Sequence, residues 1–122
     1  MSRLSQNFII VDEEQEIRQL IRCALARSFD SAAIFEAASG QEALKIFERH
    51  GADLMFIDHH IPLLDGLSLV RFLRAQQVQI PLVLISSNPQ LEPESVAAGA
   101  TRFLHKRELG KSLEGSLASW LS

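Results

Sequence analysis

Five short apolar segments constrain the fold of this 122-residue chain more than any other feature of its sequence. They begin about 20 to 30 residues apart, a spacing that fits a strand, a returning helix and the next strand. Several are apolar at consecutive positions, as is typical of strands that are covered on both faces. The predicted strands are Phe8–Val11, Ala32–Phe35, Leu54–Ile57, Leu82–Ile85 and Phe103–Leu104.

The segments between these strands carry apolar residues at helical spacing. The first stripe consists of Ile17, Leu20, Ile21, Ala24, Leu25 and Phe29. Ser39 followed by Glu42 is a capping-box pattern that predicts the start of the second helix. Further helices are predicted around 67–73, 93–98 and 109–121. Strands that alternate with helices imply a single α/β domain, covering residues 1–122, with a parallel sheet and helices on both faces.

The composition excludes several classes of protein. Lys and Arg number 12 against 15 Asp and Glu, a mildly acidic balance that argues against direct nucleic-acid binding. A single cysteine, Cys23, excludes an internal disulfide framework, and we expect it to be a packed, inert thiol. No apolar run approaches the ~18 residues of a membrane span, and the N-terminus is not a secretory signal. We therefore expect a cytoplasmic protein with no membrane association.

Polar residues follow four of the predicted strands at the point where each strand ends. Asp12 and Glu13 follow the first strand and Asp58 follows the third, whereas Ser86 follows the fourth and Lys106 the fifth. The carboxyl ends of parallel strands meet at one edge of the sheet, where such folds bind ligands. The sequence therefore predicts that these side chains converge at a single site.

The chemistry of this set is coherent. Three neighbouring carboxylates repel one another and are stable together only with a cation between them. Magnesium prefers such oxygen ligands, and an aspartate can act as a nucleophile toward phosphorus. Phosphoryl transfer chiefly requires positioning and charge neutralisation, which magnesium, an ammonium and a hydroxyl supply.

Taken in order, these motifs resemble those of the receiver domain of bacterial two-component response regulators. The resemblance extends from Phe8 to about Leu121. It rests on Ile10–Glu13, Phe56–Asp58, Pro62, Asp65–Gly66, Ser86, Ala98–Ala100, Phe103 and Lys106. It implies a flavodoxin-like, doubly wound sheet of five parallel strands in the order 2-1-3-4-5.

The resemblance also implies roles for individual residues. Asp58 matches the aspartate that is phosphorylated by a histidine kinase or phosphotransfer protein, and Ser86 and Lys106 match the residues that bind the phosphoryl group. Magnesium would be held by Asp12, Glu13, Asp58 and the backbone carbonyl of His60. We expect no enzymatic activity beyond self-phosphorylation from phosphodonors and autodephosphorylation.

Three further residues have expected roles in switching and signal lifetime. Phe103 matches an aromatic rotamer switch, although a core position is an equally good interpretation. His60 and Asn88 match the positions that flank the water attacking the aspartyl phosphate, and we expect them to tune its lifetime. An output partner or a second copy would bind the surface formed by the fourth helix, fifth strand and fifth helix.

Two alternatives remain open at this stage. Glu13 stands where Asp is commoner in the family and Arg107 where many relatives have Pro. These departures, with the short fourth helix, favour a receiver-like interaction module that is not phosphorylated. A flavodoxin-like nucleotide or flavin binder is the second alternative, but the acidic run Asp12–Glu14 would repel a phosphate after the first strand.

Overall fold

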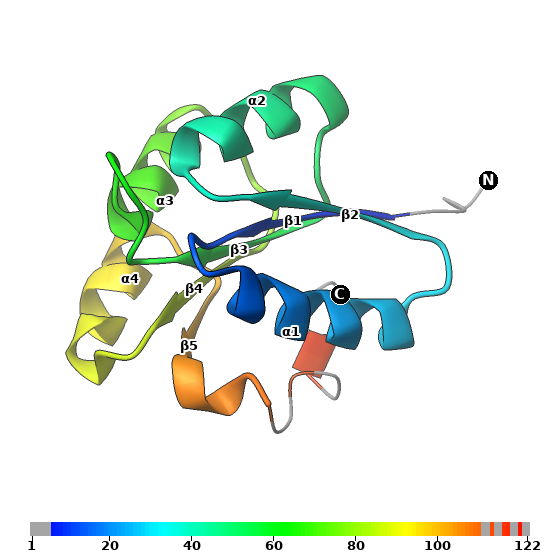
Figure 1. The fold of residues 1–122 in the computed structure, drawn as a ribbon. Helices are drawn as coiled ribbons and strands as arrows, with labels where there is room; N and C mark the ends of the chain where they lie inside the picture. Colours follow the sequence, from blue (N-terminus) through cyan, green and yellow to red (C-terminus); the bar gives the residue numbers. More distant parts are fainter. Residues whose placement is uncertain (1–5, 111–112, 114–115, 118–119, 121–122) are drawn as a thin grey trace.

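The computed structural model describes residues 6–110, 113, 116–117 and 120, and its centre is a five-stranded parallel sheet (Figure 1). The strands lie in the order β2-β1-β3-β4-β5, and every neighbouring pair is parallel. Their bounds are Gln6–Val11 (β1), Ala32–Ala37 (β2), Leu54–Asp58 (β3), Leu82–Ser86 (β4) and Arg102–His105 (β5). The predicted fold class and strand order are confirmed.

Helices cover both faces of the sheet. They are α1 (Gln15–Ser28), α2 (Gly40–His50), α3 (Gly66–Ala75) and α4 (Glu92–Ala98), with short 3₁₀ turns η1 (Pro89–Leu91) and η2 (Lys106–Glu108). Helix α1 lies on one face, whereas α2, α3 and α4 lie on the other (Figure 1). The fifth helix predicted over 109–121 falls largely outside the described residues. Leu113, Leu117 and Trp120 are described, and they pack on the α1 face.

The consecutive apolar residues of the central strands supply two separate cores. Because successive side chains of a strand point to opposite faces, Phe8 and Ile10 of β1 pack toward α1, while Ile9 and Val11 pack toward α2 and α3. Every residue of β3 and of β4 is buried. This explains why these strands do not alternate between apolar and polar residues.

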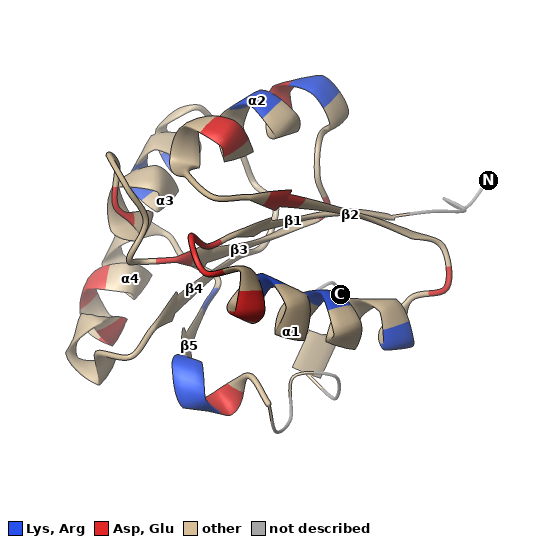
Figure 2. Ribbon diagram, in the orientation of Figure 1, with Lys and Arg blue, Asp and Glu red and all other residues tan. Residues whose placement is uncertain are grey.

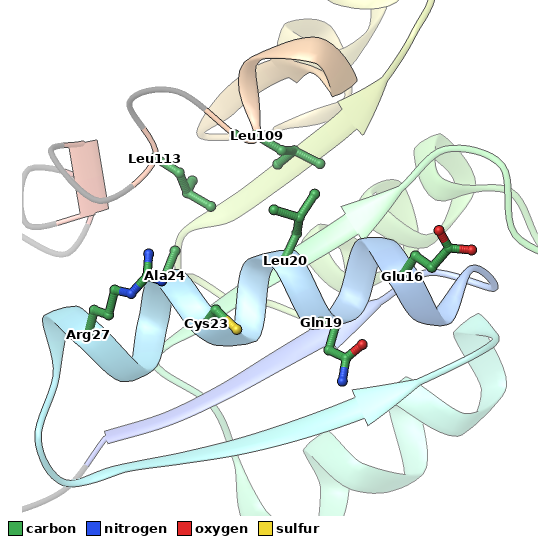
Figure 3. A pocket seen from close by; sticks show the side chains of 9 residues that line it. Glu16, Gln19, Leu20, Cys23, Ala24, Arg27, Leu109 and Leu113 are labelled. Atoms are coloured by element: carbon green, nitrogen blue, oxygen red, sulfur yellow. The ribbon is translucent and has the colours of Figure 1, made fainter.

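The predicted stripe of the first helix is only partly correct. Ile21, Ala24 and Leu25 are buried against the sheet, but Leu20 is 45% exposed and Cys23 is exposed as well. Both line a groove that is bordered by α1, Leu109 and Leu113 (Figure 3). The expectation of a packed thiol at Cys23 is therefore wrong.

The predicted helix boundaries at α2 and α4 are confirmed. The Ser39 hydroxyl accepts a hydrogen bond from the Glu42 amide at 3.2 Å, and the Glu42 carboxylate accepts one from the Ala38 amide at 2.7 Å. Helix α4 has only 7 residues and ends at Gly99, whose φ of +109° suits glycine. In the part of the chain that the structure describes, no helix is long and apolar enough to cross a membrane.

Candidate functional site

The sheet brings the predicted site residues to its carboxyl edge. Asp12 follows β1, Asp58 ends the adjacent β3, Ser86 ends β4 and Lys106 follows β5. Glu13, Asp58, His60, Ser86 and Lys106 all line one shallow pocket at this edge. Figure 2 shows the acidic turn after β1 and the basic turn after β5 on the same side of the sheet.

The position of Asp58 is fixed by the close approach of α3. A Cβ at Gly66 would lie 2.7 Å from the Asp58 carbonyl oxygen and 2.7 Å from the His59 Cα, so only glycine allows α3 to start here. The Asp65 carboxylate caps α3 by accepting a hydrogen bond from the Ser68 amide at 2.8 Å. The Asp65–Gly66 motif therefore holds the helix directly against the end of β3.

Two of the site's carboxylates are buried, and of these Asp58 lines the pocket whereas Asp12 does not. Asp12 and Asp58 are each 1% exposed. Asp12 Oδ1 accepts a hydrogen bond from the Glu14 amide at 2.8 Å, whereas Asp12 Oδ2 and both Asp58 oxygens have no hydrogen-bond partner. Buried polar atoms almost always have hydrogen-bond partners, so three buried carboxylate oxygens without one form a donor set that suits a cation.

The pKa values of the two aspartates also favour a bound cation. Burial, reinforced by the neighbouring charge of Asp12, raises the pKa of the Asp58 carboxyl to about 6. Burial also raises the pKa of Asp12, against the opposing effect of the hydrogen bond from the Glu14 amide. The ionised Asp12 thus disfavours ionisation of Asp58, and a bound cation would favour the ionised form of both carboxyls.

Lys106 provides the positive charge of the site. Its Nζ lies 3.0 Å from Glu14 Oε1 and 3.5 Å from Asp58 Oδ1. Burial lowers the pKa of Lys106, but the hydrogen bond to Glu14 and the charge of Asp58 outweigh that effect and raise it. The ammonium therefore stays charged beside Asp58. Glu14 was not predicted as a site residue, although it extends the acidic run that follows the first strand.

The donor set fits magnesium. Glu13 is exposed at the rim, and within the described ranges no three side chains of His, Cys, Asp or Glu form a metal-binding group. Magnesium keeps several of its waters and is commonly bound through one or two carboxylates. The unpaired oxygens of Asp12 and Asp58 meet that requirement.

The remaining predicted residues lie in different environments. Ser86 is buried at the pocket, and its hydroxyl accepts a hydrogen bond from the Asn88 amide at 3.0 Å. The Asn88 carboxamide instead caps η1 by accepting from the Gln90 amide, and Asn88 does not line the pocket. His60 is exposed at the rim, and Phe103 is half-buried against the core below α2 and α3.

A second support of the site was missed by the sequence reasoning. The Arg18 guanidinium donates through Nη1 to the Asp12 backbone carbonyl and through Nε to Glu36 Oε1 at 2.8 Å. Arg22 donates to the other oxygen of Glu36 at 2.6 Å. These contacts fix the turn between β1 and α1 that carries Asp12. No local pattern predicts them, because Glu36 belongs to a different strand.

This chain is similar in sequence to known regulatory proteins. It is 34% identical to the KDP operon transcriptional regulatory protein KdpE of Escherichia coli over 103 residues, 82% of this chain and 44% of that protein. It is 31% identical to the alkaline phosphatase synthesis transcriptional regulatory protein PhoP of Bacillus subtilis over 88 residues, 71% of this chain and 35% of that protein. The chain thus spans less than half the length of these curated relatives.

A solved structure agrees with these relatives. The chemotaxis response regulator CheY4 of Vibrio cholerae superposes with a TM-score of 0.84 at 26% identity, covering 96% of this chain and 99% of that one. The family model of the response regulator receiver domain matches residues 8–117. Because that match covers most of the chain and contains all four strand ends at which the site is built, the chain belongs to the response regulator receiver domain family.

Proposed function

We propose that Asp58 accepts a phosphoryl group from a phosphohistidine of a histidine kinase or phosphotransfer protein, and that this modification switches the domain between two signalling states. The observation that carries the proposal is the environment of Asp58. Its carboxylate is buried, both of its oxygens lack hydrogen-bond partners, and it borders a pocket that Lys106 also lines. A structural aspartate would be expected to have its oxygens paired.

The transfer step balances with this residue as nucleophile. One Asp58 oxygen forms a bond to phosphorus as the P–N bond of the phosphohistidine breaks. The imidazole leaves with the bonding electron pair and is neutral when its other nitrogen carries a proton. Asp58 then holds an acyl phosphate with about two negative charges in place of one.

Magnesium would be held by Asp12, Glu13, Asp58 and the backbone carbonyl of His60. When bound, it supplies the charge neutralisation that phosphoryl transfer requires. The support for this assignment is the set of unpaired oxygens on Asp12 and Asp58. Glu13 is exposed and lines the same pocket as Asp58.

Ser86 and Lys106 would bind the oxygens of the transferred group. Both line the pocket with Asp58, and Lys106 Nζ is already 3.5 Å from an Asp58 oxygen. Their movement would bias a two-state surface that includes half-buried Phe103, α4 and β5. An output partner or a second copy of the chain would recognise that surface.

The lifetime of the acyl phosphate would be set at the rim. His60 lines the pocket two residues beyond Asp58, where a bulky ring obstructs an attacking water. We expect His60→Gly to accelerate autodephosphorylation. Asn88 is the weaker candidate, because its side chain is engaged in capping η1.

Labelling with a small phosphodonor tests the proposal. Phosphoramidate with magnesium should phosphorylate the wild type and the exposed control Asp30→Asn, whereas Asp58→Asn should remain unlabelled. Chelation of magnesium should suppress the labelling of all variants. A folded wild type that takes no phosphoryl group would support the alternative of an interaction module that is not phosphorylated.

A further inference from the structure

The ammonium of Lys106 is shared unequally between two carboxylates. It donates a hydrogen bond to Glu14 Oε1 at 3.0 Å, whereas Asp58 Oδ1, at 3.5 Å, lies beyond the usual range of an N–H···O hydrogen bond. The Glu14 side chain is 59% exposed and that of Asp58 only 2%. The Lys106 ammonium therefore makes its shorter contact with the carboxylate that needs it less, because water already solvates Glu14.

The backbone of Glu14 places its side chain in this position. Glu14 is the N-cap residue of α1, but its carboxylate makes no capping hydrogen bond. Its amide is committed to Asp12 Oδ1 at 2.8 Å and its carbonyl accepts from the Arg18 amide at 3.2 Å. With the main chain fixed, the long glutamate side chain extends to Lys106, which lies 92 residues away in the sequence. A shorter aspartate would instead suit the N-cap and bond to the helix amides.

We propose that Glu14 is a positioning residue that holds Lys106 at the mouth of the site while Asp58 is unmodified, and that it releases the ammonium when Asp58 carries a phosphoryl group. This inference rests on the proposed phosphorylation of Asp58. The release follows from charge, because the phosphoryl group adds negative charge and three acceptor oxygens close to the ammonium, which one exposed carboxylate cannot match. Glu14 therefore opposes the active state.

The size of the effect follows from the exposure of Glu14. An exposed ion pair contributes little to stability, so breaking this one should favour the phosphorylated geometry about two- to fivefold. The effect should shrink in molar salt, which screens exposed charges more than buried ones.

Binding of beryllofluoride, an anion that mimics a phosphoryl group, tests the inference in the presence of magnesium. The affinity would be measured by fluorine NMR for the wild type, Glu14→Gln, Glu14→Asp and Glu16→Gln. Glu14→Asp retains the negative charge but shortens the side chain, so it separates the contact with Lys106 from the net charge. Glu16→Gln removes the same charge from the exposed first turn of α1, where Glu16 lines the separate groove of Figure 3.

We expect Glu14→Gln and Glu14→Asp to bind the anion about two- to fivefold more tightly than the wild type, and Glu16→Gln to match the wild type. Both Glu14 variants should also change the NMR signal of the Lys106 ammonium before the anion is added. Equal affinities in all four proteins would overturn the inference, as would tighter binding in Glu14→Gln alone, since that pattern reports charge and not contact. A wild type that binds no anion would instead overturn the proposed function, and this inference with it.

Discussion

Charged side chains at the two edges of the sheet differ in how many hydrogen bonds they make with the rest of the fold. Before β4, at the edge where strands begin, the Arg74 guanidinium donates to the backbone carbonyls of Gly99, Val78 and Ile80 at 2.8 to 2.9 Å. At the carboxyl edge, Asp12 Oδ2 and both Asp58 oxygens have no hydrogen-bond partner. The half-buried Arg74 guanidinium thus has its donors engaged by the fold, whereas of the four carboxylate oxygens of Asp12 and Asp58 only Asp12 Oδ1 accepts a hydrogen bond.

This difference distinguishes a charge whose hydrogen bonds stabilise the fold from charges whose oxygens are available to a ligand. Arg74 ties the end of α3 to the segment before β4 and to the turn after α4, so its removal would leave three carbonyls without their donor. The aspartates have fewer contacts to offset their burial: Asp12 Oδ1 accepts a hydrogen bond from the Glu14 amide, and Asp58 Oδ1 lies 3.5 Å from the Lys106 ammonium. Their mutual repulsion favours a bound cation. We therefore expect substitutions at the two edges to change the free energy of unfolding in opposite directions.

The largest expected change in the free energy of unfolding is at Arg74, at the edge of the sheet where the strands begin. Arg74→Met should lower the free energy of unfolding by roughly 2 to 4 kcal/mol, because several charge-assisted hydrogen bonds are lost together. Urea denaturation would measure it, with Arg71→Met as the control, since Arg71 is exposed on the same helix. If the two variants were equally stable, the Arg74 contacts would not have the structural role assigned to them.

At the carboxyl edge we expect the free energy of unfolding to change in the opposite direction. In metal-free buffer at neutral pH, Asp58→Asn should raise the free energy of unfolding by roughly 1 to 3 kcal/mol, since it removes a buried charge that nothing neutralises fully. Asp30→Asn, an exposed change of the same type, should leave stability unaltered. A destabilised Asp58→Asn would contradict the view that the ionised Asp58 is a cost to the fold.

The pH dependence sharpens the same contrast. The folded pKa of Asp58, about 6, lies above the ordinary aspartate value of 3.8, so the folded state takes up a proton that the unfolded state does not. The destabilisation is therefore fully present above the folded pKa and is relieved as the pH falls. Metal-free wild type should gain stability between about pH 7 and about pH 5, and Asp58→Asn should show a smaller gain. The same slope in both proteins would place the titrating group elsewhere.

Magnesium should produce the smallest of these effects. Magnesium that binds only the folded state stabilises it, by an amount that grows with the logarithm of the magnesium concentration relative to the Kd. We expect the free energy of unfolding of the wild type to rise by about 1 to 2 kcal/mol. The rise should be smaller in Glu13→Gln and smallest in Asp58→Asn. Chemical denaturation with and without the metal would measure it. Equal stabilisation of the wild type and Glu13→Gln would remove Glu13 from the metal site.

The sequence predicts the strands and helices, which depend on local apolar patterns, and the site residues that stand at the ends of strands. Asp12, Asp58, Ser86 and Lys106 were located because each directly follows or ends an apolar segment, and parallel strands bring those positions together. The burial expected for Leu20 and Cys23 is wrong, because helical spacing alone does not show which residues at the side of an apolar stripe contact the sheet.

The contacts that were missed join distant parts of the chain. Glu14 bonds to Lys106 across 92 residues and Arg18 to Glu36 across 18, and in each case the partner lies on another element. Arg74 is similar, since the carbonyl of Gly99 lies 25 residues further on. Side chains of this length have several partners within reach, and only the packed fold selects among them.

The central claim is that the buried Asp58 is the phosphoacceptor, and the most direct test is to locate the modified residue. Wild type treated with acetyl phosphate and magnesium would be reduced with borohydride, which converts an acyl phosphate into a stable alcohol, and then mapped by peptide mass spectrometry. We predict a single reduced residue, at position 58, that disappears when magnesium is chelated. Reduction at another carboxylate, with Asp58 intact, would contradict the account.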